Sequence, residues 1–150
     1  MPRGRVRREP VFADAGVFLG FLLREDEDAY SRAQALFAGA EAGTLRIETS
    51  ALALAEVVRV LEQRARLVRA RIAEVVETIL GTRNLRVHDA PVLRAAARLY
   101  ADRELSFDAA CDIAYMLGRG IGGIATFDRA RYAGVADLGL VTADALEARP

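Results

Sequence analysis

Four acidic residues are placed in the sequence so that one site could contain them all: Asp14, Glu56, Asp108 and Asp128. Carboxylates that gather in one place repel one another, which raises their pKa values unless a cation lies among them. Oxygen ligands of this kind suit the hard ions Mg²⁺ and Mn²⁺. A divalent ion held by carboxylates activates water for in-line attack on a phosphodiester. The four acids therefore predict metal-dependent nuclease chemistry.

Short apolar segments that alternate with helical segments would have to position these acids. The pattern predicts strands at 10–14, 44–49, 85–89 and 122–128, with a further strand near 138–141. Pairs of helices are expected between them, at 15–23 and 28–43, at 51–66 and 68–80, and at 91–103 and 106–117. This order predicts an α/β fold, a three-layer sandwich with a central parallel sheet of four or five strands flanked by helices.

In such a fold, ligands bind beyond the carboxyl ends of the strands. Asp14 and Asp128 each end a predicted strand, so we expect both at that edge. Glu56 and Asp108 lie on helix faces that point away from the core. The face of Glu56 also carries Arg59 and Gln63. The face of Asp108 also carries Asp112, Tyr115 and Arg119. Each acid taken alone also has a structural explanation, because Asp caps helices and turns and Glu is common on solvated helix faces.

Composition narrows the remaining possibilities. The chain of 150 residues has 21 basic and 21 acidic residues, so its net charge indicates neither nucleic-acid binding nor its absence. Cys111 is the single cysteine, which excludes an internal disulfide and a zinc site built on cysteines, and the lone His88 is not expected to bind metal. We expect a cytoplasmic protein without a membrane segment.

The first nine residues are basic and rich in Arg, Pro and Gly. They predict a disordered lead at 1–9, followed by a single domain at 10–150. An RNA-contacting arm and an overextended start codon are the alternatives for this lead.

Four stretches follow one another at suitable intervals: "VFADAGVFLGFLL" with Asp14, "SALALAEVVRVLEQ" with Ser50 and Glu56, "LSFDAACDIAYML" with Asp108, and "GIATFDRARY" with Thr126 and Asp128. Together they resemble the motifs of PIN-domain ribonucleases, especially the VapC-type toxins of toxin–antitoxin pairs. The likeness covers about residues 10–135. No single stretch is specific, and the signal comes from all four in order.

The resemblance implies a Mg²⁺- or Mn²⁺-dependent endoribonuclease that is usually a homodimer and is held inactive by a small antitoxin protein. It implies that the four acids hold the metal, and that Thr126 orients a ligand or the attacking water by hydrogen bonding. Arg59 and Arg119 would contact RNA phosphates. The alternative is that both side chains are solvated and contact no RNA.

Two departures from the family pattern affect the expected site. A polar residue often follows the first Asp at a short distance, where this chain has Gly16. In the third motif one residue commonly separates Phe from Asp, whereas Phe107 and Asp108 are adjacent here. Asp112, one helical turn later, is therefore a rival to Asp108 or an additional metal ligand.

Other interpretations of the sequence stay open. The altered third motif is compatible with a catalytically weak or silent PIN-like domain that binds RNA or protein. A phosphatase with Asp14 as its nucleophile would need a second Asp at position 16, where this chain has Gly16.

The stretch "GRGIGG" at 118–123 follows a helix and precedes a strand, so it predicts a tight turn rather than a dinucleotide site. The apolar residues Phe18, Phe21, Leu22 and Leu23 predict a subunit or antitoxin interface.

Overall fold

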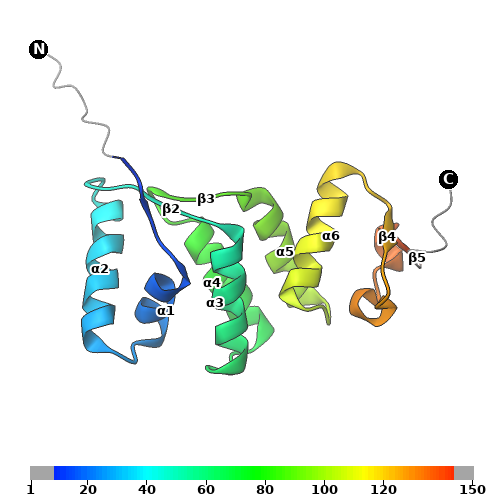
Figure 1. Cartoon of the computed structure of the whole chain (residues 1–150), viewed down its shortest axis with the longest axis horizontal. Coiled ribbons are helices and arrows are strands. Elements are labelled where there is room, and N and C mark those ends of the chain that lie inside the picture. Colours follow the sequence, from blue (N-terminus) through cyan, green and yellow to red (C-terminus); the bar gives the residue numbers. More distant parts are fainter. Residues whose placement is uncertain (1–8, 144–150) are drawn as a thin grey trace, which may run out of the picture.

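The computed structural model describes residues 9–143; the predicted basic lead, apart from Glu9, and the last seven residues lie outside the described part. Figure 1 shows the elements arranged along one long axis, with α1 and α2 toward one end and β4 and β5 at the other. In chain order the elements are β1 (Val11–Phe12), α1 (Ala15–Leu23), α2 (Glu27–Glu41), β2 (Ile47–Thr49), α3 (Ala51–Gln63), α4 (Arg69–Leu80), β3 (Leu85–Val87), α5 (Ala90–Asp102), α6 (Phe107–Arg119), β4 (Gly123–Ala125), η1 (Arg129–Tyr132), η2 (Ala136–Leu138) and β5 (Val141–Ala143).

The helices begin where the sequence provides a capping side chain. Ser50 caps α3 by accepting a hydrogen bond from the backbone N–H of Ala53 at 3.2 Å, as predicted. Ser106 caps α6 in the same way, so Asp108 lies in the first turn of α6 and is not its N-cap. Pro91 lies in the first turn of α5, where its missing N–H costs no helical hydrogen bond.

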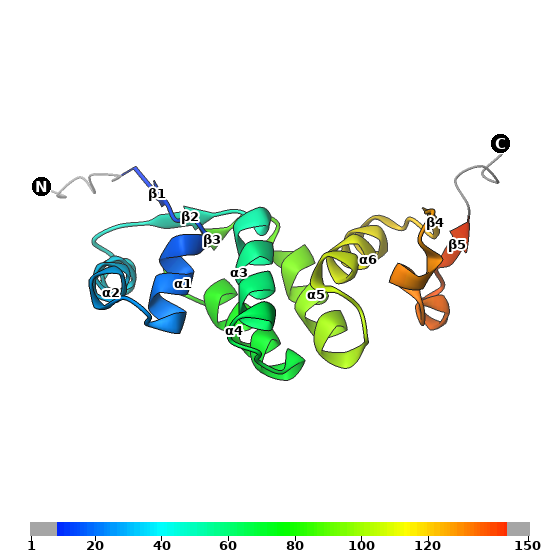
Figure 2. The same ribbon diagram turned by 60° about the horizontal axis from the view of Figure 1, so that its bottom comes forward.

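The first three strands form a parallel sheet in the order β1-β2-β3. Ile47 of β2 lies opposite Leu85 of β3, and both side chains are buried. The register places Phe12 and Arg86 on the other face, where Phe12 is 62% exposed and Arg86 is also exposed. Figure 2 shows α1, α2 and α4 together on one side of this sheet.

The described residues thus differ from the expected three-layer sandwich with one central sheet. Five parallel strands are present, but they form a three-stranded sheet and a separate two-stranded sheet, β4-β5. The last strand is Val141–Ala143 rather than 138–141. In this structure α6 packs along α5, and β4 begins far from β1 (Figure 1).

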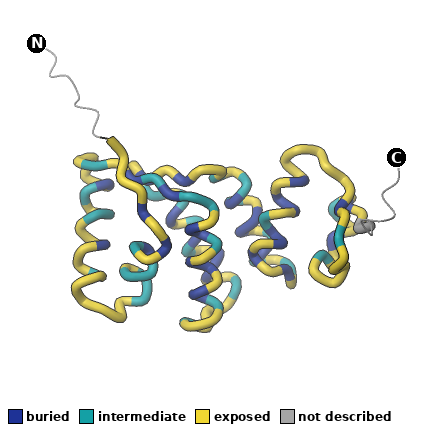
Figure 3. Tube along the Cα trace, viewed as in Figure 1, coloured by how far each residue is buried: buried dark blue, intermediate teal, exposed yellow. Residues whose placement is uncertain are grey.

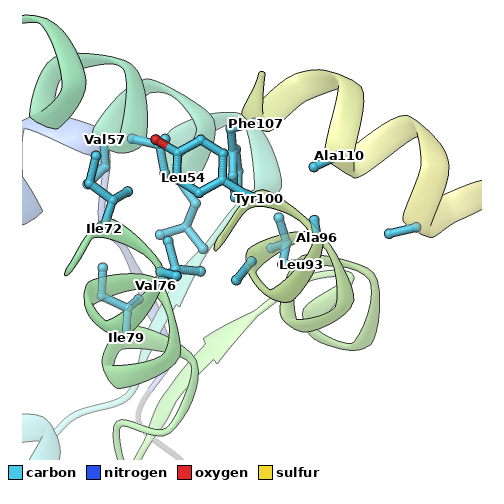
Figure 4. Close-up of a cluster of buried hydrophobic side chains, with 14 of the residues drawn as sticks. Leu54, Val57, Ile72, Val76, Ile79, Leu93, Ala96, Tyr100, Phe107 and Ala110 are labelled. Atoms are coloured by element: carbon cyan, nitrogen blue, oxygen red, sulfur yellow. The ribbon is translucent and has the colours of Figure 1, made fainter. Parts of the chain in front are cut away.

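The hydrophobic core lies between the helices and the covered face of the sheet (Figures 3 and 4). Leu54 and Ile72 are completely buried, and Tyr100 is 1% exposed. The hydroxyl of Tyr100 donates a hydrogen bond to Glu62, and the guanidinium of Arg69 lies 4.6 Å from the centre of the Tyr100 ring. The polar edge of this large aromatic residue is therefore satisfied, while its ring fills the core.

No helix in the range 9–143 is both long enough and apolar enough to span a membrane. The most apolar helix, α1, has nine residues, whereas a spanning helix needs about 20.

Candidate active site

Asp14 lies between β1 and α1 and caps that helix. Its side chain accepts a hydrogen bond from the N–H of Val17 at 3.2 Å, and the residue is exposed. A Cβ atom at Gly16 would lie 3.2 Å from Asp14 Oδ1, closer than an ordinary van der Waals contact. A side chain at position 16 would therefore crowd the carboxylate, which gives a steric reason for glycine at this departure from the family pattern.

The position of Asp14 depends on Thr49, which is completely buried at the end of β2. The Thr49 hydroxyl donates a 2.7 Å hydrogen bond to the carbonyl of Ala13, the residue before Asp14. Because Ala13 is itself buried, water cannot replace this donor without a rearrangement. Thr49 therefore fixes the backbone from which the Asp14 carboxylate projects.

We expect Thr49→Val to lower the free energy of unfolding by about 1–3 kcal/mol, because it leaves the buried carbonyl of Ala13 without its donor. Urea denaturation measures this change. Thr44→Val is the matched control, since the exposed Thr44 hydroxyl also donates to a carbonyl, that of Gly39 at 3.0 Å. Water can replace that donor, so the control should stay within about 0.5 kcal/mol of wild type. Equal losses in both variants would contradict the assigned role of Thr49.

Glu56 lies on the exposed face of α3, as the helical pattern predicted. Its carboxylate lies 3.8 Å from the guanidinium of Arg59, and both side chains are 57% exposed. Arg59 also donates a hydrogen bond to Gln63 at 3.2 Å. Exposed pairs of this kind contribute little to stability, so Glu56 and Arg59 can exchange partners at little cost.

Asp108 and Asp112 lie one turn apart on α6, and both contact the guanidinium of Arg131. The sequence pattern did not reveal this contact. The guanidinium of Arg131 lies 2.8 Å from the carboxylate of Asp108 and 3.4 Å from that of Asp112. The hydroxyl of Tyr132 donates a 2.8 Å hydrogen bond to Asp112. Because Arg131 contacts both acids, both stay candidates for the third acid of the site.

Burial, charge and hydrogen bonding around α6 shift the pKa values of three groups. The Ser106 hydroxyl and the Arg131 guanidinium hold the pKa of Asp108 below its ordinary value. Burial, reinforced by the hydrogen bond to Asp112, raises the pKa of Tyr132. Burial likewise raises the pKa of the Cys111 thiol to about 12, so this thiol stays protonated at neutral pH.

We expect Arg131→Gln to raise the pKa of Asp108, because the substitution removes a positive charge that favours the ionised carboxylate. Titration of the carboxyl carbon by NMR measures the shift. Arg119→Gln is the control, because the guanidinium of Arg119 lies over the ring of Tyr115 at 4.4 Å. An unchanged Asp108 titration in Arg131→Gln, or an equal change in Arg119→Gln, would show that the ion pair does not set this pKa.

Asp128 and Thr126 form a compact turn after β4. The Thr126 hydroxyl accepts a 3.0 Å hydrogen bond from the N–H of Asp128. The Asp128 carboxylate accepts one from the N–H of Arg131 at 3.2 Å and so caps η1. Arg131 therefore links two predicted acids: its backbone contacts Asp128 and its side chain contacts Asp108.

The predicted acids come from several packed elements. Asp14 precedes α1, which packs against α3, the helix of Glu56. Asp108 and Asp112 lie on α6, which packs on α5 and also contacts α3, and Asp128 follows β4 (Figure 1). No cluster of three or more His, Cys, Asp or Glu residues within 9–143 could hold a metal ion. The grouping of the predicted acids around one Mg²⁺ or Mn²⁺ ion therefore stays a prediction.

The lone histidine pairs with an acid outside the four motifs. His88 Nε2 lies 2.9 Å from a carboxylate oxygen of Glu48, across strands β2 and β3.

Comparison with protein families matches residues 11–138 to the PIN domain. The chain belongs to the PIN domain family. PIN domains have an α/β fold, are generally nucleases and usually use divalent metal ions. The match covers nearly the same residues as the four motifs of this PIN domain, including all four predicted acids. Comparison with curated protein sequences found no match.

Several contacts of this PIN domain could not be found from the sequence. Arg131 and Tyr132 follow Asp128 in the stretch "DRARY", but nothing in their spacing indicates a contact with α6. In the sequence, nothing distinguishes Thr49 from other strand residues. Only its complete burial shows that its hydroxyl needs a hydrogen-bond partner.

Proposed function

We propose that this PIN domain is a metal-dependent endoribonuclease that hydrolyses RNA phosphodiester bonds. One observation carries the proposal: the PIN family match spans all four motif acids, and two of these acids, Asp14 and Asp128, lie within three residues of the carboxyl ends of parallel strands. Mg²⁺ or Mn²⁺ is the proposed cofactor because the candidate ligands are all carboxylates.

We further propose that the protein is a VapC-type toxin whose partner is a small antitoxin protein and whose location is the cytoplasm. An apolar cavity of about 890 Å³ supports the partner proposal. It lies between α1, α2, α4 and α5, and its lining includes three of the residues predicted to form an interface: Phe18, Phe21 and Leu22. A cavity of this kind suits an amphipathic helix from a partner.

RNA would contact the exposed arginines near the acids. Arg59 lies beside Glu56, and Arg119 lies on the polar stripe of α6. Both are proposed phosphate contacts, which would contribute affinity without sequence selectivity.

A silent binding domain is the second candidate function. It is favoured by the absence, within residues 9–143 of one chain, of an acidic cluster able to hold a metal. In such a domain the acids would serve only as caps and partners for arginine, as Asp14 and Asp108 do in this structure.

The experiment that separates these candidates is a cleavage assay on a panel of labelled single-stranded and hairpin RNAs. We expect cleavage with Mg²⁺ or Mn²⁺ and none with EDTA, and duplex DNA of matched sequence serves as the substrate control. Cleavage that persists in EDTA would exclude the proposed metal dependence. RNA binding without cleavage under any metal condition would support the silent domain instead.

A further inference from the structure

The first strand leaves one edge of the larger sheet open. β1 is the end strand of its sheet and pairs only with β2 among the described strands. The N–H groups of Val11 and Ala13 donate to carbonyls of the β2 segment, at 2.9 Å each. Because alternate residues of a strand face opposite edges, the N–H and C=O groups of Phe12 point to the open edge. Open strand edges are templates for pairing with another chain.

The fourth strand presents a complementary open edge. β4 pairs in parallel with β5, and the N–H of Val141 donates to the carbonyl of Gly122 at 2.9 Å. By the same alternation, Gly123 and Ala125 direct their backbone groups to the edge that no described strand occupies. Among the described strands, β1 and β4 each therefore have an open edge, and each is followed by one of the predicted acids, Asp14 or Asp128.

Large apolar side chains are exposed on both sheets. Val11 is 47% and Phe12 62% exposed on β1, as the exposed colouring of that strand shows in Figure 3. Around β4, Ile121 is 43%, Phe127 83% and Val141 67% exposed. Pairing of the two edges would remove part of this apolar surface from water, which favours association.

The connection between α6 and β4 keeps the two edges of one chain apart. Gly120 ends α6 with a φ of 69°, in the left-handed region that favours glycine. The N–H of Ile121 donates to the carbonyl of Met116 at 3.0 Å, which fixes the direction of the exit. With α6 packed on α5, β4 leaves the helix away from β1 of the same chain (Figures 1 and 2).

We propose that β4 of one copy pairs in parallel with β1 of a second copy, and that the exchange is reciprocal. A symmetric exchange closes a dimer and leaves neither copy with an open edge at β1 or β4. Each half of the dimer then has a continuous sheet in the order β3-β2-β1-β4-β5. No change in the packing of α6 on α5 is required.

The exchanged dimer would complete the acidic site between copies, an inference that rests on the proposed nuclease function. Parallel pairing of β1 with β4 brings the carboxyl ends of both strands to the same edge. Asp14 of one copy would then lie near Asp128 of the other, while Asp108 stays on α6, which contacts α3 of its own copy. Other edges, such as that of β3, would not bring Asp14 and Asp128 together, which selects β1 as the pairing partner of β4.

Mixed dimers provide the decisive activity test. Asp14→Asn and Asp128→Asn chains with different affinity tags are co-expressed, and dimers that carry both tags are isolated. One site of each mixed dimer then contains both substitutions and the other contains none. We expect about half of the wild-type activity per dimer, whereas each parent variant is inactive. Mixed dimers as inactive as the parents would overturn the exchange.

A matched pair of variants controls this test. Asp14 and Glu56 come from the same part of the chain, so a mixed dimer of Asp14→Asn and Glu56→Gln has one substitution in each of its sites. We expect no recovery of activity in this dimer. Recovery in both mixtures would overturn the proposal, because the Asp14→Asn and Glu56→Gln dimer has no intact site under the exchange.

A cross-linking test decides the exchange even if the protein is not a nuclease. Cys111→Ser removes the single native thiol. In a parallel pair, Phe12 would lie opposite a β4 residue whose own backbone groups bond to β5, which is Gly122 or Ile124. A chain with Phe12→Cys is then mixed with a chain carrying Gly122→Cys or Ile124→Cys, refolded together and oxidised. Neighbouring strands lie about 5 Å apart, within reach of a disulfide. We expect a covalent dimer with at least one of the two partners, because no chain in the mixture can form this bridge by itself.

The controls for cross-linking use an exposed position outside the proposed interface. Leu52 on α3 is 83% exposed, so Leu52→Cys mixed with either β4 variant should give only background dimer. Absence of the bridge in both β1–β4 mixtures would overturn the proposal. So would a wild-type protein that sediments as a monomer at the concentrations of these tests.

Discussion

Replacing Asp14 with asparagine should reduce metal-dependent RNA cleavage by about 100-fold or more. Substitution of a residue that merely hydrogen-bonds to a metal ligand already lowers metal affinity or activity by about 10–100-fold. Asparagine has the same shape and can still accept the hydrogen bond from Val17 N–H that caps α1. The substitution therefore removes negative charge while the fold is kept. Single-turnover cleavage of the best RNA substrate, together with a thermal melt, measures both properties.

Asp26→Asn is the matched control for this prediction. Asp26 caps α2 by accepting a 2.9 Å hydrogen bond from Ala29 N–H, so it has the same structural role as Asp14 without lying in a PIN motif. The control should cleave RNA at the wild-type rate. Similar losses in both variants would mean that the effect comes from helix capping, and full activity in Asp14→Asn would exclude this carboxylate from the site.

Leu54→Ala should produce the largest loss of stability. Leu54 is completely buried on α3, and Figure 4 shows it among the core side chains, near Tyr100. Truncation removes buried apolar contacts and leaves a cavity, which costs about 2–5 kcal/mol. For a domain of this size we expect a fall in melting temperature of roughly 5–15 °C. Urea and thermal denaturation followed by circular dichroism measure the change.

The same helix provides the control for this core substitution. Leu52 is two residues earlier on α3 and is 83% exposed, so Leu52→Ala makes the same chemical change without creating a cavity. We expect it to stay within about 0.5 kcal/mol of wild type. A small effect of Leu54→Ala, or equal effects of both substitutions, would contradict the position of the core.

The helices could be predicted from the sequence because their signals are local. The predicted helix 15–23 coincides with α1, and the predicted cap Ser50 caps α3. Of the turn predicted at 118–123, Gly120 is the C-cap of α6, while Gly118 and Arg119 still belong to α6 and Gly123 begins β4. Apolar periodicity also separated Leu54, which is buried, from Glu56, which is exposed.

The acids were selected from the sequence by motif, which gives their position along the chain but not their neighbours in space. The structure places Asp14 and Asp108 in contacts that the motifs do not specify: Asp14 caps α1, and Asp108 pairs with Arg131. Their assignment to one metal site stays a prediction, and the mixed-dimer experiment tests it.

By itself, the sequence determined the order of strands and helices, most helix ends and the membership of four acids in PIN motifs, because capping, periodicity and motif spacing act over a few residues. Only the tertiary structure decided that β4 pairs with β5 in a second sheet and that Arg131 lies between Asp108 and Asp112. These features depend on how α6 packs against α5, and contacts between segments distant in sequence have no local signal that fixes them.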